Sequence, residues 1–102
     1  MPHDKAIIRK ARLKDAHEIQ KLINFYAQKG EMLPRSLSDI FEAIREFTVW
    51  TNGQGICGVS ALHICWEDLA EIRSLAVKPE YCCKGIGTAL ASQCISEAIE
   101  LN

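Results

Sequence analysis

The sequence has no long hydrophobic run and no excess of either charge. No apolar stretch approaches the ~18 residues of a membrane-spanning helix, and the start, Met1 to Lys5, lacks the apolar core of a signal peptide. Twelve Lys and Arg stand against 13 Asp and Glu, a formal net charge of -1. No global field therefore draws the protein to nucleic acid or to an anionic membrane, although a local basic patch is not excluded. We expect a cytoplasmic protein with neither of these partners.

Metal-binding and disulfide patterns are also missing. The cysteines number five, an odd count, and none belongs to a C-x-x-C motif or stands with a histidine pair at zinc-finger spacing. We therefore expect no metal site and free thiols in a reducing compartment. For the adjacent Cys82 and Cys83, a redox role is the alternative, because a thiol near a helix start can have a lowered pKa.

What the sequence does contain is the composition of one folded domain. Its 102 residues are 48% hydrophobic and 25% charged, close to the average for globular chains. It shows no internal repeat, low-complexity tract or linker. We expect residues 1–102 to form a single domain with a modest core.

Two amphipathic helices are predicted in the first half of the chain. Asp15 is placed to cap the first, with Glu18 as its capping-box partner, and apolar residues recur at helical spacing until Gly30, which can end the helix. Ser36 is placed to cap the second. The expected buried stripe of the second helix consists of Leu37, Ile40, Phe41 and Ile44.

Strand patterns fill most of the rest. Residues 6–9 are a short strand candidate, and residues 47–51 and 56–65 read as two strands around an Asn-Gly turn. Residues 66–68 should connect to a strand over 69–77, and helical spacing begins near residue 86. The order strand, helix, helix, strand, strand, strand, helix predicts an α+β layered domain with a mixed, mostly antiparallel sheet flanked by helices.

Residues 82–88, which lead into the last predicted helix, carry the clearest functional signal. The N–H groups at a helix start have no intrahelical acceptor, and the helix dipole places partial positive charge there, so an anion binds favourably. Gly85 and Gly87 remove the Cβ atoms that would hold a phosphate away from the main chain, and Lys84 adds a positive charge. The alternative is that both glycines only permit close packing of the helix on the sheet.

Two common phosphate-binding motifs do not fit this loop. The pattern GxxxxGK[ST] is absent, and GxGxxG fails because residue 90 is leucine. These mismatches argue against a mononucleotide hydrolase and against a Rossmann dehydrogenase.

The segment around the loop resembles the acetyl-CoA motif of the GNAT family of N-acetyltransferases. In that family a strand ending in Val-x-Pro is followed by Gln/Arg-x-x-Gly-x-Gly/Ala and a helix; here Val77-Lys78-Pro79 precedes Cys82-Cys83-Lys84-Gly85-Ile86-Gly87. Residues 71–77 also look like the matching strand of ArgA-type members, the N-acetylglutamate synthases. The resemblance implies an N-acetyltransferase that moves an acetyl group from acetyl-CoA, its cosubstrate, to the amino group of a small molecule such as glutamate.

By this resemblance, acetyl-CoA binds along the loop over residues 77–89. Cys82 departs from the family, whose Gln or Arg at this position helps to hold the pyrophosphate, so we expect weakened binding that rests mainly on backbone donors. The backbone N–H of Val77 or Ala76 would donate toward the thioester carbonyl or the pantetheine arm. The expected cofactor-binding residues are Leu75, Ala76, Val77, Cys82, Cys83, Lys84, Gly85, Ile86, Gly87 and Thr88.

Two charged residues of the preceding strand are candidates for the acceptor side. Alternation along a strand places residues 71, 73, 75 and 77 on one face. Glu71 stands where many relatives carry the general-base glutamate, and Arg73 could hold a substrate carboxylate through a bidentate pair. The alternative for both is a solvated strand face with a cross-strand ion pair.

The resemblance further implies strands and a helix after residue 100, whereas the sequence stops at Asn102. We therefore expect a C-terminally shortened domain whose last strand has an open edge. Three functions stay open on this basis. They are an enzyme completed by a partner chain, most simply as a homodimer that covers this edge; a CoA-binding module without turnover; and a structural subunit.

Overall fold

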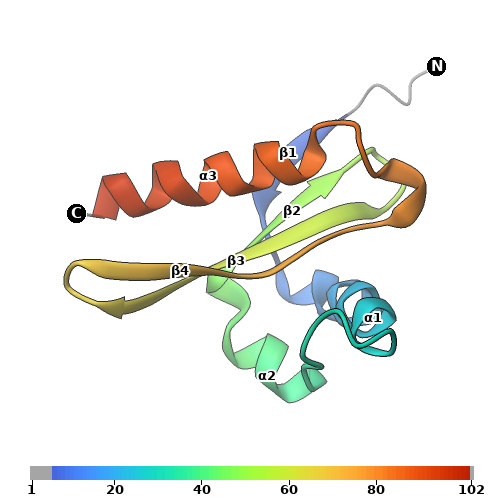
Figure 1. Ribbon diagram of the computed structural model, residues 1–102, viewed down its shortest axis with the longest axis horizontal. Helices are drawn as coiled ribbons and strands as arrows, with labels where there is room; N and C mark the ends of the chain where they lie inside the picture. Colours follow the sequence, from blue (N-terminus) through green and yellow to red (C-terminus); the bar gives the residue numbers. More distant parts are fainter. Residues whose placement is uncertain (1–5, 102) are drawn as a thin grey trace.

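The computed structural model describes residues 6–101 as one sheet with helices on both faces (Figure 1). Of the predicted domain 1–102, residues 1–5 and 102 lie outside the described residues. The predicted α+β class and the predicted order of helices and strands are confirmed. The elements are β1 (Ile7–Lys10), α1 (Ala16–Ala27), α2 (Leu37–Glu42), β2 (Phe47–Thr51), β3 (Ile56–Trp66), β4 (Leu69–Val77) and α3 (Ile86–Leu101), with short 3₁₀ turns at Leu13–Asp15, Ile44–Glu46 and Pro79–Tyr81.

The sheet has the strand order β1-β2-β3-β4, and each neighbouring pair is antiparallel. The predicted hairpin between β2 and β3 is confirmed: the side-chain oxygen of Asn52 accepts the backbone N–H of Gln54 (2.9 Å) and of Gly55 (3.2 Å). β3 is longer than predicted, because Trp66 pairs with Leu69 instead of belonging to the connection. The strand over 69–77 has the predicted bounds.

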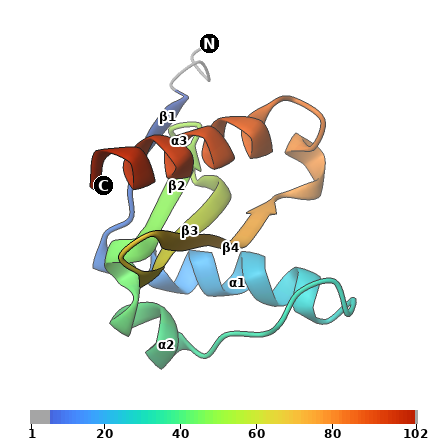
Figure 2. The same cartoon turned by 60° about the vertical axis from the view of Figure 1, so that its left-hand side comes forward.

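The helices α1 and α2 cover one face of the sheet, and the residues buried there form what we call the α1-side core (Figure 2). Helix α1 contributes side chains at helical spacing, as the apolar periodicity predicted. Phe47 and Val49 of β2 meet them and are fully buried. The α1-side core consists of Ala16, Ile19, Leu22, Ile23, Ile40, Phe47, Val49, Ile56, Val59, Ala61 and Ala76.

Helix α3 alone covers the opposite face, over a smaller set of buried residues that we call the α3-side core: Cys57, Ile86 and Leu90. Gly58 of β3 lets the helix approach closely. A Cβ at Gly58 would lie 2.9 Å from Leu90 Cδ1 and 3.0 Å from Ile86 Cγ2. The start of α3 is therefore set against β3 by close contact at this glycine.

The predicted capping box at the start of α1 is wrong. The Asp15 carboxylate accepts the backbone N–H of Arg12 (2.7 Å) and pairs with the Arg9 guanidinium (2.8 Å) instead of capping α1. The Glu18 carboxylate accepts the N–H of Ile56 (2.9 Å), at the start of β3. Both carboxylates thus fasten α1 to the sheet, a use that local sequence spacing does not reveal.

The predicted cap of α2 is confirmed, because Ser36 Oγ accepts the N–H of Asp39 (3.0 Å). The predicted stripe of this helix is only partly right. Ile40 is fully buried, whereas Phe41 is 38% exposed and its ring meets His17 edge to face. Leu37 and Ile44 are partly buried and pack against the α1-side core, so Phe41 is the member of the predicted stripe that faces outward.

Candidate functional site

β4 is irregular just before its end, where an extra residue forms a β-bulge. Ala76 pairs with Val59 and Arg73 with Ala61, so Ser74 and Leu75 together stand opposite a single residue of β3. Ser74 has φ 55°, in the left-handed region that residues with a side chain rarely adopt. The bulge shifts the alternation of side chains along the strand.

The predicted common face of residues 71, 73, 75 and 77 is therefore wrong. Residues paired across two antiparallel strands point to the same face. Arg73 stands opposite Ala61 of the α1-side core, whereas Val77 packs against the α3-side core. Glu71 and Arg73 thus face the α1 side, and the strand turns Val77 to the α3 side.

Glu71 and Arg73 bind each other. Arg73 Nε donates to Glu71 Oε1 at 2.6 Å, and the side chains are 52% and 44% exposed for Glu71 and Arg73 respectively. The alternative to a site role was an ion pair across two strands. The observed pair instead joins two residues of the same strand. The roles predicted for Glu71 and Arg73 stay predictions.

The loop after β4 has the backbone geometry of a tight turn into α3. Cys83 and Gly85 have φ 64° and 84°, and Cys82, Cys83, Lys84 and Gly85 are exposed. At the start of α3, the backbone N–H of Ala89 donates to the carbonyl of Gly85 (3.0 Å), and it is the first N–H of the helix with a backbone acceptor among the described residues. The earlier N–H groups of the helix start are therefore free for an anion.

The two loop glycines are not explained by packing. A Cβ at Gly85 would meet nothing within 4 Å, and one at Gly87 would meet only Val77 Cγ2, at 3.8 Å. Gly85 has a positive φ, which favours glycine. Gly87 has neither a positive φ nor a close contact that would exclude a Cβ. The alternative, that both glycines serve close packing of helix on sheet, therefore fails; Gly58 is the glycine with that role. Open space at the loop fits a phosphate-bearing ligand.

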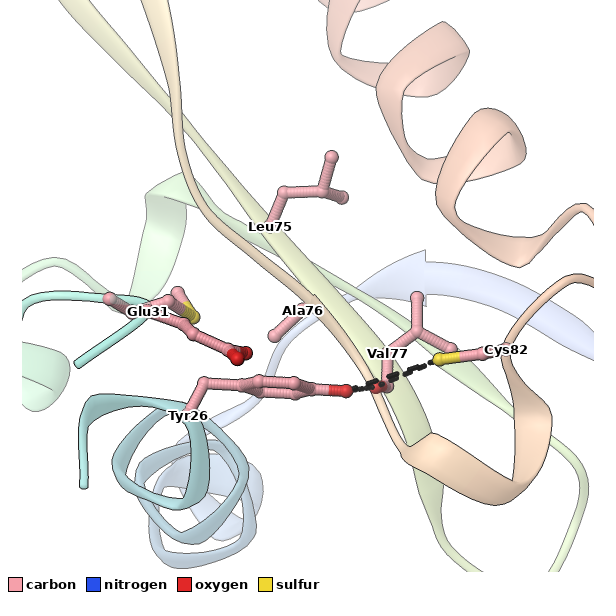
Figure 3. A pocket seen from close by; sticks show the side chains of 7 residues that line it. Tyr26, Glu31, Leu75, Ala76, Val77 and Cys82 are labelled. Carbon is pink, nitrogen blue, oxygen red and sulfur yellow. Dashed lines mark hydrogen bonds between the residues drawn. The ribbon is translucent and has the colours of Figure 1, made fainter. Parts of the chain in front are cut away.

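A pocket of about 270 Å³ lies at the end of β4, on the side of α1 (Figure 3). The Tyr26 hydroxyl donates to the carbonyl of Val77 and lies 4.0 Å from Cys82 Sγ. Burial raises the pKa of Tyr26, and the neighbouring Cys82 raises it further, so the phenol stays protonated at neutral pH. The pocket is lined by Tyr26, Glu31, Met32, Leu75, Ala76, Val77 and Cys82, which we call the β4-end pocket.

The resemblance to the GNAT family implies that Tyr26 and the loop over residues 29–35 could border the acceptor site, but the sequence assigned no role to Tyr26, Glu31 or Arg35. Tyr26 belongs to the apolar stripe of α1, and Glu31 lies in the loop after it, so neither stands in a motif. Arg35 donates to Ser74 Oγ (3.3 Å), and its guanidinium lies 5.2 Å from the centre of the Phe47 ring. Arg35 thereby fastens the bulge to the loop between α1 and α2.

Within residues 6–101, no group of three or more His, Cys, Asp and Glu side chains is arranged to hold a metal ion. No helix in the same range has both the length and the apolar character to cross a membrane. All five cysteines are free.

Comparison with known proteins decides the family. The model of the acetyltransferase (GNAT) family matches residues 7–102, nearly the whole chain. The chain belongs to the GNAT family. The resemblance seen in the loop sequence is thereby confirmed, and the GNAT fold is the one that the structure shows.

The relatives include an amino-acid acetyltransferase. The chain is 36% identical over 98% of its length to an amino-acid acetyltransferase of Mycobacterium tuberculosis, and 42% identical over 91% to an uncharacterised N-acetyltransferase of Chlorobaculum tepidum. It spans 59% and 60% of those two relatives. Both similarities concern about three fifths of a longer protein.

Solved structures agree. A Mycobacterium tuberculosis protein in complex with CoA superposes with a TM-score of 0.88 at 36% identity, covering 93% of this chain and 58% of that one. N-acetylglutamate synthase of Neisseria gonorrhoeae, complexed with coenzyme A and N-acetyl-glutamate, gives 0.90 at 30% identity, covering 95% of this chain and 23% of that one.

Proposed function

We propose that this GNAT chain transfers an acetyl group from acetyl-CoA to the amino group of a small molecule, an amino acid such as glutamate. The observation that carries the proposal is the free helix start of α3, with its unpacked Gly87, beside a pocket at the end of β4. The amino-acid acetyltransferase and N-acetylglutamate synthase relatives support the acceptor class.

The cofactor side of the proposal rests on backbone groups. The N–H groups over residues 83–88 would hold the pyrophosphate, with Lys84 adding charge. The thiol of Cys82 lies 3.6 Å from the carbonyl of Lys78. It offers the pyrophosphate no positive charge, unlike an arginine at this position. Leu75, Ala76 and Val77 would border the arm that carries the thioester, which supplies the activated acetyl group.

The acceptor side needs a neutral amine and a route for its proton. The amine nitrogen forms a bond to the thioester carbonyl carbon, the carbon–sulfur bond breaks, and the departing thiolate takes a proton. We propose Glu71 as the general base and Arg73 as a contact for an acceptor carboxylate. Their mutual ion pair would open when the acceptor binds, and Arg73 would exchange one carboxylate partner for another.

We further propose a cytoplasmic homodimer. β4 is the last strand of the order, and Leu69, Ile72 and Leu75 on it are exposed by 59%, 39% and 41%. An exposed apolar edge strand favours pairing with another chain, and five free cysteines fit a reducing compartment. Light scattering after size exclusion tests the dimer, which a monomer at all concentrations would refute.

Binding of CoA is the first test. CoA at 100 times its Kd stabilises a protein by about 2.7 kcal/mol, so the melting temperature should rise by several degrees. In Gly87→Asp the rise should disappear, because a carboxylate then occupies the anion site. Ser92→Asp, which adds the same charge at an exposed position of α3, is the matched control and should keep it. No rise in the natural chain at millimolar CoA would leave only the structural function.

Turnover is the second test. Glu71→Gln should lower the rate of CoA release with an amino-acid acceptor by about 100-fold, the usual effect of losing a general base, while the CoA-induced rise in melting temperature stays. Unchanged turnover would remove Glu71 from the mechanism. CoA binding without turnover for any amino acid would favour the binding-module alternative.

A further inference from the structure

Glu31 is the one charged side chain among the seven residues that line the β4-end pocket. Figure 3 shows its carboxylate directed into the same space as the Tyr26 ring and Ala76. The other lining residues provide apolar surface, the thiol of Cys82 and the phenol of Tyr26, whose O–H already donates a hydrogen bond to the Val77 carbonyl. The pocket therefore has one strong, unused hydrogen-bond acceptor.

The backbone holds Glu31 at this position. Gly30 has φ 76° and donates to Ala27 (3.0 Å), and the N–H of Glu31 donates to Tyr26 (3.1 Å). These two bonds are the Schellman arrangement that ends a helix at a glycine. The end of α1 thus holds the backbone of Glu31 against the backbone of Tyr26.

Glu31 is an exposed carboxylate that is set apart by its place in the pocket. Glu71 and Glu97 pair with Arg73 and Lys10, whereas Glu42 and Glu80 are exposed like Glu31 but do not line the β4-end pocket. Among residues 6–101, no Lys, Arg or His side chain pairs with Glu31. A carboxylate beside apolar surface, with no cation of its own, matches an ammonium group of a ligand, since charge-assisted hydrogen bonds are the strong ones.

We propose that Glu31 is the docking site for the ammonium group of the acceptor, and that it makes the enzyme select primary amines that are cationic at neutral pH. This inference rests on the proposed acetyl transfer. The bound amine would lie at the end of β4, where Leu75, Ala76 and Val77 border the thioester. Glu31 is then a substrate-binding residue, and removal of the amine proton is left to Glu71.

Binding of a matched pair of probes tests the proposal without turnover. Calorimetric titration of the CoA-saturated protein should show glutamate binding about tenfold more tightly than glutarate, which lacks the amine. Glu31→Gln should abolish this preference, and Glu31→Asp, which keeps the charge, should retain part of it. Glu42→Gln removes the same charge from an exposed position on α2 and should change nothing.

Kinetics give the second readout. In Glu31→Gln the acceptor KM should rise about tenfold while the acetyl-CoA KM stays within twofold. An unchanged acceptor KM would overturn the proposal, and so would a rise confined to the acetyl-CoA KM, which would assign Glu31 to the cofactor. If the natural chain does not bind CoA, the proposed function fails, and the glutamate and glutarate titrations of the free protein still decide the role of Glu31.

Discussion

The two faces of the sheet are held in different ways. The α1-side core joins residues from two helices and from β2, β3 and β4, whereas three buried residues make up the α3-side core. Polar contacts differ as well. On the α1 side, half-buried hydrogen bonds join Asp15, Glu18 and Tyr26 to the sheet. Helix α3 has an exposed ion pair, Lys10 with Glu97, and one buried polar contact, made by Cys94.

The α3 face also buries polar side chains. Thr48 and Ser60 are paired across β2 and β3 and are 1% and 0% exposed beneath α3. Ser60 Oγ lies 3.3 Å from Cys94 Sγ, but Thr48 Oγ1 has no partner among the described residues. From this difference we expect stability to come mainly from the α1 face, and the helix that follows the proposed cofactor loop to be held less firmly.

Truncating one large side chain on each face should expose this difference most clearly. Phe47→Ala should lower the free energy of unfolding by about 4 kcal/mol and Leu90→Ala by about 2 to 3 kcal/mol. Both side chains are fully buried, but half-exposed neighbours around Leu90 can close part of its cavity. Urea denaturation measures both values, and a larger loss for Leu90→Ala would reverse the comparison.

The Arg9–Asp15 pair should give the α1 face a pH-dependent stability. The Arg9 guanidinium lowers the pKa of Asp15 below its usual 3.8, so the pair contributes fully above that value and is lost as the pH falls through the lowered pKa. Asp15→Asn should cost about 2 kcal/mol at pH 7, and this difference should shrink below pH 3.8.

Urea denaturation midpoints, determined from about pH 2 to about pH 7, measure the effect, because this range spans the usual pKa of a carboxyl group. Asp39→Asn, an exposed carboxylate at the start of α2, is the control and should change stability by about 0.5 kcal/mol or less. A difference between the natural chain and Asp15→Asn that stays constant with pH would refute the role of the pair.

Gly58→Ala should separate α3 from the sheet more than it disturbs the α1 face. The new Cβ would press on Leu90 and Ile86 at about 3 Å, and overpacking of this kind costs about 1 to 2 kcal/mol. Amide hydrogen exchange should quicken in residues 86–101 and stay unchanged in α1. Equal quickening on both sides of the sheet would show that the two faces unfold together.

Thr48→Val should have the smallest effect and the opposite sign. Valine keeps the shape of threonine and removes a buried hydroxyl without a partner, so we expect stabilisation by about 1 kcal/mol. Thr51→Val, at a half-buried position of the same strand, should be nearly neutral. A loss of stability in Thr48→Val would mean that the hydroxyl is satisfied in solution.

Patterns within one element were predictable from the sequence. The periodicity of α1, the bounds of β4 and the turn at Asn52 depend on residues close together in the chain. The loop over 82–88 was found the same way, because its signal is a spacing of glycines after a strand. The capping box failed because Arg9, on another element, takes the carboxylate of Asp15.

The bulge at Ser74 could not be predicted. A serine at φ 55° has no distinctive sequence pattern, and its hydroxyl accepts a hydrogen bond from Arg35 of a distant loop. Without the bulge, simple alternation placed Glu71 and Val77 on one face, so the predicted face was wrong although the strand was right.

The sequence by itself therefore determined the elements, their order and the anion-binding loop, because local backbone preferences and the period of apolar residues select them. The tertiary structure alone decided which side chains meet. Tyr26 and Glu31 share a pocket with Val77 and Cys82 across some fifty positions of the chain, since packing of α1 on the bulged end of β4 brings them together. The loop could be predicted from residue spacing because neighbours in the sequence form it. For the pocket, the family resemblance offered only Tyr26 and the loop over residues 29–35 as a possible border, because only folding makes its residues neighbours.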